Sequence, residues 1–402
     1  MKILFLTLVK IKSIEERGIY SDLLRKFRDE GFEVFVVSPL ERREKKATHI
    51  TKEDGTTLLN VRTFNLQKVN IIEKGIGTLA IEHQYLRAIK KYFSKPKFDL
   101  ILYSTPPITF SKVIDFIKKR DNAYSYLLLK DIFPQNAVDM KMIKEGSLLH
   151  KMFLSKERRL YETSDAIGCM SEANRKYLSL HNPTINPEKI EVNPNSISPI
   201  AFDQTIEEKR TIKEKYGLPI NKKIFVYGGN LGKPQGIDFL IETIGSNKNS
   251  DVCFLIVGFG TEYNKIYSWF QNNQPKNAVL LNGLPKQDYD ILLNACDVGM
   301  IFLNKDFTIP NFPSRLLSYL EMKKPVIAAT DANTDIGIEI EKNKCGYAVL
   351  SGDILTMQKV IDEISNDEVK YKLMAENAWN YLQKEFKVEY SYQLIKKRLE
   401  NV

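Results

Sequence analysis

The chain has 402 residues, of which 43% are hydrophobic and 27% charged, and it carries a formal net charge of +9. This is the profile of an ordinary globular protein, and its length favours two domains over one. The first apolar run, residues 3–9, ends at Lys10 without a cleavage site of small residues, so we expect no signal peptide. No stretch approaches the roughly 20 apolar residues of a membrane-spanning helix.

The cysteines argue against a zinc-binding module and against a fold held together by disulfides. The chain has four of them, Cys169, Cys253, Cys296 and Cys345, far apart and in apolar surroundings. This spacing matches neither a zinc site nor a disulfide framework. We therefore expect buried thiols, no metal site and a cytoplasmic location.

Charge is distributed unevenly along the chain. Residues 1–200 hold 34 Lys and Arg against 24 Asp and Glu, whereas the remainder is close to neutral. A basic half suits nucleic acid, an anionic membrane surface or a phosphorylated substrate. It is equally compatible with solvated helix faces, so the excess alone does not identify a partner.

Apolar runs of strand length alternate with amphipathic segments throughout the first half. An example of the latter is residues 19–31, an expected helix that ends at Gly31. The predicted strands of this half are 2–8, 33–39, 58–64, 98–104, 124–130, 166–171 and 189–194. Their hydrophobicity is continuous rather than alternating, which is typical of parallel strands covered by helices on both faces.

The same pattern restarts in the second half. Its predicted strands are 222–229, 252–260, 278–283, 298–303, 325–330 and 346–350. A polar, proline-containing stretch at 196–223 reads as an inter-domain linker. The sequence therefore predicts an α/β protein with two doubly wound domains, 1–200 and 205–375, followed by C-terminal helices at 376–402 that pack back toward the first domain.

A glycine-rich loop follows the first strand of the second half. It reads YGGNLGKPQGIDFL (227–240), with Gly229 near the strand end and Lys233 within the loop. Glycines let backbone N–H groups approach an anion, and a following helix adds partial positive charge. The loop has neither the Gly-Lys-Ser/Thr ending of a Walker loop nor the spacing of a dinucleotide motif.

Two more loops are expected at the same edge of the sheet. VGFGTE (257–262) places Gly258 at a strand end, and NFPSRLLSYLEMKKPVIA (311–328) opens a helix with Pro-Ser-Arg. Ser314 could cap this helix, and Arg315 offers a fork suited to phosphate. We therefore expect a diphosphate between this helix and the glycine-rich loop, with Lys233 and Arg315 as counter-charges.

These segments resemble a known family. YGGNLGKPQGIDFL, LIVGFGTE, LNGLPKQDYDILLNACDVGM, NFPSRLLSYLEMKKPVIA and GIEIEKNKCGYAV look like the C-terminal domain of family-four retaining glycosyltransferases, which have the GT-B fold. In the first half, LILYSTPPITFSKVI, LKDIFPQNAVDM and CMSEANRKYL look like the branch that builds capsule, O-antigen and related surface polysaccharides. The resemblance covers almost the whole chain, in order.

The resemblance implies two Rossmann-like domains facing a cleft, with a nucleotide-sugar donor, expected to be UDP-linked, on the second domain. It implies sugar transfer with retention of configuration, without a cofactor or metal. Cations and N–H groups aimed at the leaving diphosphate would do most of the catalysis. That work would fall to Lys233, Arg315, Ser314 and the backbone at Gly229, while Leu284 would meet the base with its backbone.

Other positions follow from the same resemblance. Asp131, at the end of a strand of the first domain, would orient the acceptor or the sugar, and Gly18 would lie in a mobile acceptor-side loop, 11–20. Asp306 and Asn311 precede the Pro-Ser-Arg helix and could meet sugar hydroxyls, and Gly258 and Asn230 would line the donor site.

The sequence departs from the family at several positions. Many members carry two glutamates eight residues apart that touch the sugar and ribose; here those positions are Pro310 and Ser318. Glu321, one helical turn later, could serve instead. The arginine and lysine common in the glycine-rich loop correspond to Asn230 and Gln235, for which Lys233 could compensate.

Four alternatives stand beside a transferase. A nucleotide-sugar 2-epimerase shares the architecture, and a catalytically silent binding or scaffold subunit would explain the missing glutamates. A hydrolase is poorly supported, because the four histidines form no visible triad. Nucleic acid is not an expected partner, since the chain has no RNP motif, zinc module or recognition helix.

The basic half has a specific partner under the transferase interpretation. Acceptors would be glycans or polyprenyl-diphosphate-linked sugars at the inner face of the plasma membrane. Residues 41–46, 86–97 and 151–160 mix cations with apolar or aromatic neighbours, and we expect them to hold the protein peripherally on an anionic bilayer.

Overall fold

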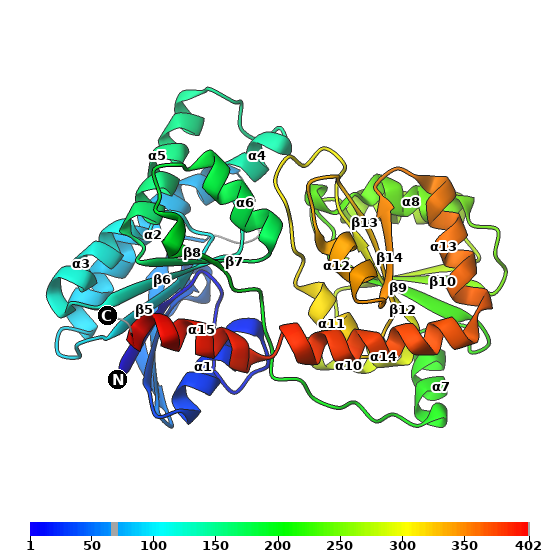
Figure 1. Ribbon diagram of the computed structural model, residues 1–402, viewed down its shortest axis with the longest axis horizontal. Helices are drawn as coiled ribbons and strands as arrows, with labels where there is room; N and C mark the ends of the chain where they lie inside the picture. Colours follow the sequence, from blue (N-terminus) through cyan, green and yellow to red (C-terminus); the bar gives the residue numbers. More distant parts are fainter. Residues whose placement is uncertain (66–70, 401–402) are drawn as a thin grey trace. The chain divides into compact units, whose positions relative to one another are not determined.

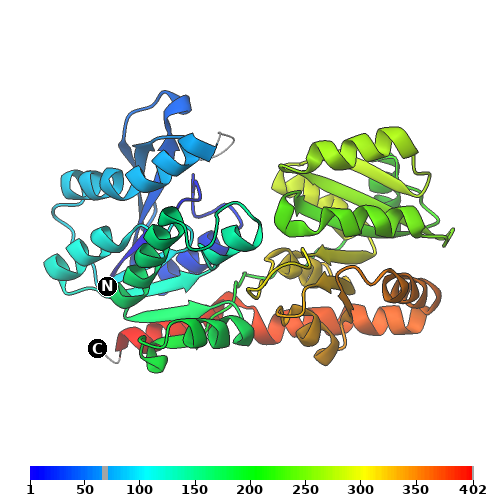
Figure 2. The same ribbon diagram turned by 90° about the horizontal axis from the view of Figure 1, so that it is seen from above.

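The computed structural model describes residues 1–65 and 71–400, which form two compact units (Figure 1). The first unit is Met1–Ser198 together with the C-terminal helix α15 (Val388–Glu400), and the second is Pro199–Lys387. Each unit contains one largely parallel sheet flanked by helices (Figures 1 and 2). This is the α/β class that the sequence predicts.

The sheet of the first unit has eight strands in the order β3-β4-β2-β1-β5-β6-β7-β8. Its elements are β1 (Lys2–Leu6), α1 (Ile19–Asp29), β2 (Glu33–Glu41), η1 (Arg42–Glu44), β3 (His49–Glu53), β4 (Thr56–Thr63), α2 (Ile71–Tyr92), β5 (Leu100–Ser104), α3 (Ser111–Asp121), β6 (Tyr124–Leu129), α4 (Gln135–Asp139), α5 (Leu148–Thr163), β7 (Ala166–Cys169), α6 (Glu172–His181), η2 (Pro187–Lys189) and β8 (Ile190–Val192). Every strand predicted for this half is present. Their continuous apolar runs are buried on both faces, as in β5, where all five residues are buried.

Strand β3 is absent from the sequence-based prediction. It pairs antiparallel with β4 at the edge of the sheet, and none of its five residues is fully buried. Its sequence, HITKE, is polar because an edge strand faces solvent on most sides, and such a segment has no apolar run to reveal it.

The sheet of the second unit has six parallel strands in the order β11-β10-β9-β12-β13-β14. Its elements are α7 (Ile206–Lys215), β9 (Lys223–Asn230), η3 (Lys233–Gln235), α8 (Ile237–Ser246), β10 (Val252–Phe259), α9 (Tyr263–Asn273), β11 (Ala278–Asn282), α10 (Lys286–Ala295), β12 (Val298–Phe302), α11 (Arg315–Glu321), β13 (Val326–Thr330), α12 (Ile336–Lys342), β14 (Gly346–Leu350), α13 (Ile354–Asn366) and α14 (Glu368–Glu385). Again, every strand that the sequence predicts is found.

Helices cover the two faces of this sheet. On one face, α8 and α13 share a core with Val298 and Met300 of β12. Side chains alternate along a strand, so Gly299 faces the other way, and there the ring of Tyr319 from α11 occupies the space that a Cβ at Gly299 would need. Helix α11, which carries Arg315, is thus fixed against the strand that precedes it.

The C-terminal helix α15 completes the core of the first unit. Tyr392 is 1% exposed and packs edge-on against Phe27 of α1, with ring centroids 5.0 Å apart. Arg398 adds an ion pair with Glu191, 2.9 Å long. Only this last helix belongs to the first unit: the segment predicted to begin at 376 starts inside α14, which lies in the second unit.

The break between α14 and α15 lies at Phe386, where no proline or glycine marks it in the sequence. The Phe386 ring packs edge-on against Tyr381, with centroids 4.9 Å apart, and anchors the end of α14 in the second unit. All four cysteines are buried and free. Within the described residues, no helix is long and apolar enough to cross a membrane.

Candidate active site

The strand order of the second unit favours a ligand site between β9 and β12. Counted within the unit, the order is 3-2-1-4-5-6, and it reverses direction between these two strands. Loops leaving neighbouring strands at such a point run to opposite faces of the sheet and leave a crevice at the carboxyl ends. The glycine-rich loop follows β9, and α11 with Arg315 follows β12.

The glycine-rich loop is held by backbone contacts that only glycine permits. Gly229 has a φ of +127°, and a Cβ on Gly258 of β10 would lie 2.0 Å from the carbonyl oxygen of Gly229. Gly236, with a φ of +55°, would likewise place a Cβ 2.7 Å from the Leu303 oxygen. Gly258 therefore acts on the site sterically, by letting β10 approach the end of β9.

Two neighbouring loops fix the glycine-rich loop further. The Leu231 N–H donates to the Phe259 oxygen at 2.9 Å, which ties it to the end of β10. The Asn304 N–H donates to the Pro234 oxygen at 3.0 Å, and the Asn304 side chain donates to the Lys233 oxygen at 3.3 Å. These bonds leave the side chain of Lys233 exposed on a loop whose backbone is fixed.

Arg315 reaches this loop from α11. Its Nη2 donates to Gln235 Oε1 at 2.6 Å, and its guanidinium lies 4.3 Å from the ring centroid of Tyr227. The same Nη2 lies 3.5 Å from where a Cβ on Gly229 would be. Among the described residues, buried Nη1 has no hydrogen-bond partner. A charged donor in this position, beside a glycine at a strand end, is an arrangement that suits an anion.

Tyr227 and Gln235 are site residues that sequence reasoning missed as such. Tyr227 is buried, and its hydroxyl donates to the Asn230 oxygen at 2.7 Å, which shapes the turn after β9. Gln235 stands where the family resemblance implies a lysine, and it orients Arg315 instead of meeting the ligand as a cation. Both lie inside the quoted loop, but only the fold brings them to Arg315.

The start of α11 differs from expectation. Ser314 makes no side-chain capping bond and has helical φ and ψ, so the prediction that its hydroxyl caps the helix is wrong. The Leu316 and Leu317 N–H groups bond to the oxygens of Pro313 and Ser314 in tight turns. With these two amides engaged, Arg315 is the group of this helix best placed to meet an anion.

The loop between β12 and α11 is anchored by the turn after β13. The Asn311 N–H donates to Thr334 Oγ1 at 3.1 Å, and Thr334 in turn donates to Asp331 at 2.8 Å. The side-chain amide of Asn311 donates to the Ile309 oxygen, so its nitrogen is already in use. Asp306 is exposed at the tip of this loop.

Glu321, the residue suggested in place of the missing glutamates, has another hydrogen-bond partner in the structure. It is 3% exposed, and its Oε1 accepts a hydrogen bond from the Ile200 N–H at 3.0 Å. The carboxylate thus holds the linker segment, and its burial argues against the predicted contact with the donor. Ser318, one turn earlier, is half-buried on the same helix.

An exposed aromatic residue lies near Leu284. Phe259, the last residue of β10, is 64% exposed, and a Cβ on Gly283 would come within 2.5 Å of its ring. Gly283 immediately precedes Leu284 in the turn between β11 and α10. Such a large exposed apolar ring is unusual at the end of a strand that is otherwise buried. In the sequence, the Gly-Phe-Gly pattern of VGFGTE could have indicated it.

In the first unit, Asp131 is positioned at the carboxyl end of β6. The N–H groups of Lys130 and Asp131 both donate to Thr105 Oγ1, at 3.0 and 3.2 Å, and Asn136 donates to the Asp131 carboxylate at 2.7 Å. Burial lowers the pKa of Lys130 to about 7. Lys130 was not singled out from the sequence, although it is adjacent to Asp131 in LKDIFPQ.

Gly18 precedes α1 in extended conformation, with a φ of 168°. The nearest atom to a Cβ there would be Ser21 Oγ at 4.0 Å, so no close contact requires a glycine at this position. Its N–H donates to Asp22 at 3.2 Å. Within the described residues, no cluster of three or more His, Cys, Asp or Glu side chains could hold a metal ion.

Comparisons with known proteins show which sequences and folds this chain resembles. Residues 208–381, most of the second unit, match the family described as "Glycosyl transferases group 1". The probable glycosyltransferase WbjE of Pseudomonas aeruginosa is 23% identical over 297 residues, which are 72% of this chain and 71% of WbjE. The putative colanic acid biosynthesis glycosyl transferase WcaI of Escherichia coli (strain K12) is 27% identical over 129 residues, 31% of each protein.

A solved structure extends the similarity to the whole chain. Anabaena Alr3699/HepE in complex with UDP has a TM-score of 0.69 at 16% identity, and the alignment covers 100% of both chains. At this identity the likeness shows the fold. The chain thus has the GT-B fold, and residues 208–381 of its second unit, less than half of the chain, are similar to the group 1 glycosyl transferases.

Proposed function

We propose that the protein is a retaining glycosyltransferase that moves a sugar from a UDP-linked donor to a glycan or lipid-linked acceptor in surface polysaccharide synthesis. The observation that carries the proposal is the guanidinium of Arg315, which lies beside Gly229 and whose buried Nη1 has no hydrogen-bond partner among the described residues. The UDP-bound Alr3699/HepE and the colanic acid relative WcaI support the donor and the pathway class.

The donor's diphosphate would lie between Gly229 and Arg315. As the sugar leaves, charge builds on the diphosphate, and fixed cations stabilise that charge more than the ground state. Arg315 would supply the fixed charge, held by Gln235 and Tyr227, while exposed Lys233 would supply a second. The base would reach the turn at Leu284, where Phe259 offers a face for stacking.

The acceptor would be served by the first unit. Asp131 is oriented by Asn136 and could position an acceptor hydroxyl, and Gly18 would lie in the acceptor-side loop. Asp306, Asn311 and Ser318 would meet sugar hydroxyls. The transferred group would be a hexosyl or N-acetylhexosaminyl sugar.

A silent binding subunit is the second candidate, and a specific observation favours it. The glutamate pair is replaced by Pro310 and Ser318, and Glu321 is occupied by the Ile200 N–H. Donor turnover separates the two functions. We expect purified protein to release UDP from one UDP-sugar, with the released or transferred sugar keeping its anomeric configuration by NMR. Binding of UDP-sugars without UDP release, in the presence of glycan acceptors, would indicate the silent subunit.

We further propose that the first unit binds an anionic membrane surface. Around the start of α5, Met142 is 53%, Leu148 88% and Leu149 48% exposed, and Leu154 follows one turn later at 37%. The same stretch of sequence carries the exposed cations Lys141, Lys144, Lys151 and Arg158, together with one exposed carboxylate, Glu145. Apolar side chains flanked by lysines are the chemistry of interfacial binding. At 41–46, by contrast, Arg43 and Glu44 are engaged in local ion pairs.

Replacing Leu148 and Leu149 with aspartate should reduce co-sedimentation with anionic vesicles at least tenfold, because it removes apolar area and adds repulsion. Leu355→Asp, an equally exposed leucine at 82% on α13 of the second unit, should have no effect. Wild-type binding to anionic vesicles that is no stronger than to neutral ones, at low salt, would disprove the membrane proposal.

A further inference from the structure

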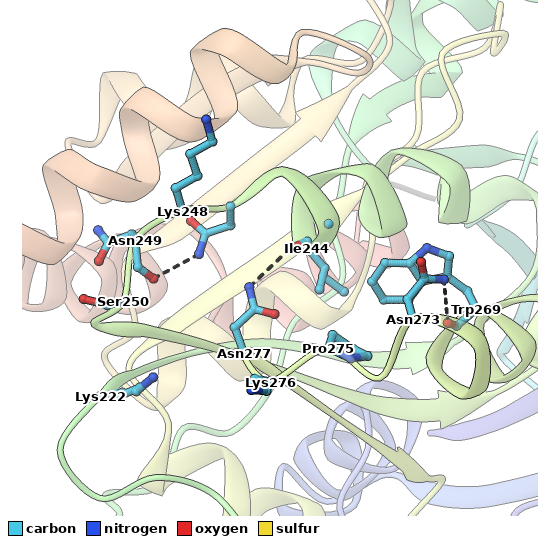
Figure 3. A pocket seen from close by; sticks show the side chains of 12 residues that line it. Lys222, Ile244, Lys248, Asn249, Ser250, Trp269, Asn273, Pro275, Lys276 and Asn277 are labelled. Atoms are coloured by element: carbon cyan, nitrogen blue, oxygen red, sulfur yellow. Dashed lines mark hydrogen bonds between the residues drawn. The ribbon is translucent and has the colours of Figure 1, made fainter.

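A cavity of about 420 Å³ lies at the opposite end of the second unit's sheet from Gly229. It is lined by Lys222, which precedes β9, by residues 247–250 before β10 and by residues 275–277 before β11 (Figure 3). Strand β9 has eight residues, so at about 3.3 Å per residue the two ends of the sheet lie about 23 Å apart along this strand. The cavity is therefore not part of the donor site, and neither the family resemblance nor the proposed transfer uses it.

The cavity is basic, although the Asp362 carboxylate accepts a hydrogen bond from the lining residue Asn249 at 2.7 Å. Lys222, Lys248 and Lys276 line it, and no acidic residue does. Within the described part of the chain, none of the three has a carboxylate at ion-pair distance, whereas the neighbouring Lys223 is paired with Glu368 at 3.0 Å. Three lysines with no ion-pair partner among the described residues make the surroundings of this cavity favourable for an anion.

Its amide side chains offer acceptors to a ligand. The nitrogens of Asn273 and Asn277 donate to the backbone oxygens of Trp269 and Ile244, at 2.9 and 3.2 Å (Figure 3). The nitrogen of Asn247 donates to the Asn249 oxygen at 3.2 Å, and its Oδ1 is buried without a partner among the described residues. With their nitrogens held by the protein, the side-chain oxygens of Asn273 and Asn277 remain to accept hydrogen bonds from hydroxyl groups.

Trp269 gives the cavity an apolar wall. It is half-buried on α9, packs against the core of this unit and lies 3.3 Å from where a Cβ on Gly245 of α8 would be. An indole beside hydroxyl acceptors suits a ligand with one apolar face and a polar rim, which is the chemistry of a sugar ring. Because three lysines line the cavity, its ligand should also carry a negative charge.

We propose that this cavity is an ancillary site for an acidic sugar unit, a saccharide that carries a carboxylate or a phosphate. Such a site would hold a charged glycan on the second unit, remote from the reacting atoms. The inference rests on the cavity alone and goes beyond the proposed transfer reaction.

Tryptophan emission can test the proposal, because the chain has only two tryptophans. In a Trp379→Phe background, Trp269 is the only one left, and titrations would use D-glucuronate, glucose 6-phosphate, glucose and inorganic phosphate. We expect a saturable change in emission with both acidic sugars, and affinities at least tenfold weaker for glucose and for phosphate. Should Trp379→Phe fail to fold, the wild-type response should disappear in Trp269→Phe.

A second variant tests whether binding of the acidic sugars depends on the lysines. Lys248→Met with Lys276→Met should weaken binding of the acidic sugars at least tenfold, whereas Lys342→Met, a 68% exposed lysine on α12, should not. UDP binding should be unchanged in all of these proteins. A loss of acidic-sugar binding can therefore be told apart from a loss of donor binding. No saturable response, equal binding of phosphate and glucose 6-phosphate, or an unchanged lysine variant would each overturn the proposal.

Discussion

Arg315→Ala is expected to weaken binding of the UDP-sugar donor by about 1.5–3 kcal/mol, the range for a charge-assisted hydrogen bond. That corresponds to roughly 10- to 150-fold in Kd. The reason is geometric: Nη2 is held by Gln235 at 2.6 Å and the guanidinium by the Tyr227 ring, so Nη1 is fixed in place beside Gly229. Isothermal titration calorimetry with UDP and UDP-sugars measures the loss.

Three controls separate a ligand contact from a structural role for Arg315. Arg315→Lys keeps the charge but loses the planar fork, so its affinity should lie between wild type and alanine. Lys323→Ala, an exposed cation just after α11, should leave binding unchanged. Lys233→Ala should cost less than Arg315→Ala, because its ammonium is solvated in the free protein. A folded Arg315→Ala protein with wild-type affinity would mean that Arg315 serves only packing against Tyr227.

Gly258→Ala is expected to destabilise the second unit by about 1–3 kcal/mol, the range for overpacking a tightly packed site. The added Cβ would lie 2.0 Å from the Gly229 oxygen, a backbone atom that cannot rotate away like a side chain. Strands β9 and β10 must then separate at the end that carries the glycine-rich loop. Donor affinity should fall in the same variant, because Gly229 moves relative to Arg315.

Differential scanning calorimetry measures this change, and tryptophan emission identifies the transition of the second unit, since Trp269 and Trp379 both lie there. Gly18→Ala is the control, because its backbone is extended and a Cβ would meet nothing closer than 4.0 Å. Its effect should stay within about 0.5 kcal/mol. Equal thermal midpoints for Gly258→Ala and wild type would show that β9 and β10 do not require their close approach.

The strands could be predicted because burial on both faces leaves a continuous apolar run, as in LILYS of β5 and VCFLIVGF of β10. The missed strand β3 has no such run, since it lies at an edge. The end of α14 at Phe386 could not be predicted either. It is fixed by packing against Tyr381 rather than by a helix-breaking residue.

For the site, residue type indicated which side chains could matter but not what they contact. Arg315 and the glycine-rich loop were recognisable from chemistry and spacing. Gln235, in contrast, acquires its role only when α11 brings Arg315 to it. Glu321 illustrates the reverse error: its place on the helix suggested a ligand contact, but the linker at Ile200 uses the carboxylate. Such pairings join residues about 80 to 120 positions apart and depend on tertiary packing.

The most direct test of the account is a calorimetric panel of UDP, GDP, ADP and UDP-sugars on the full chain, each with and without magnesium. The account predicts that UDP and one or more UDP-sugars bind with the same affinity in both conditions, and that Arg315→Ala weakens this binding. Binding of none of these nucleotides to the folded protein would contradict a donor site between β9 and β12.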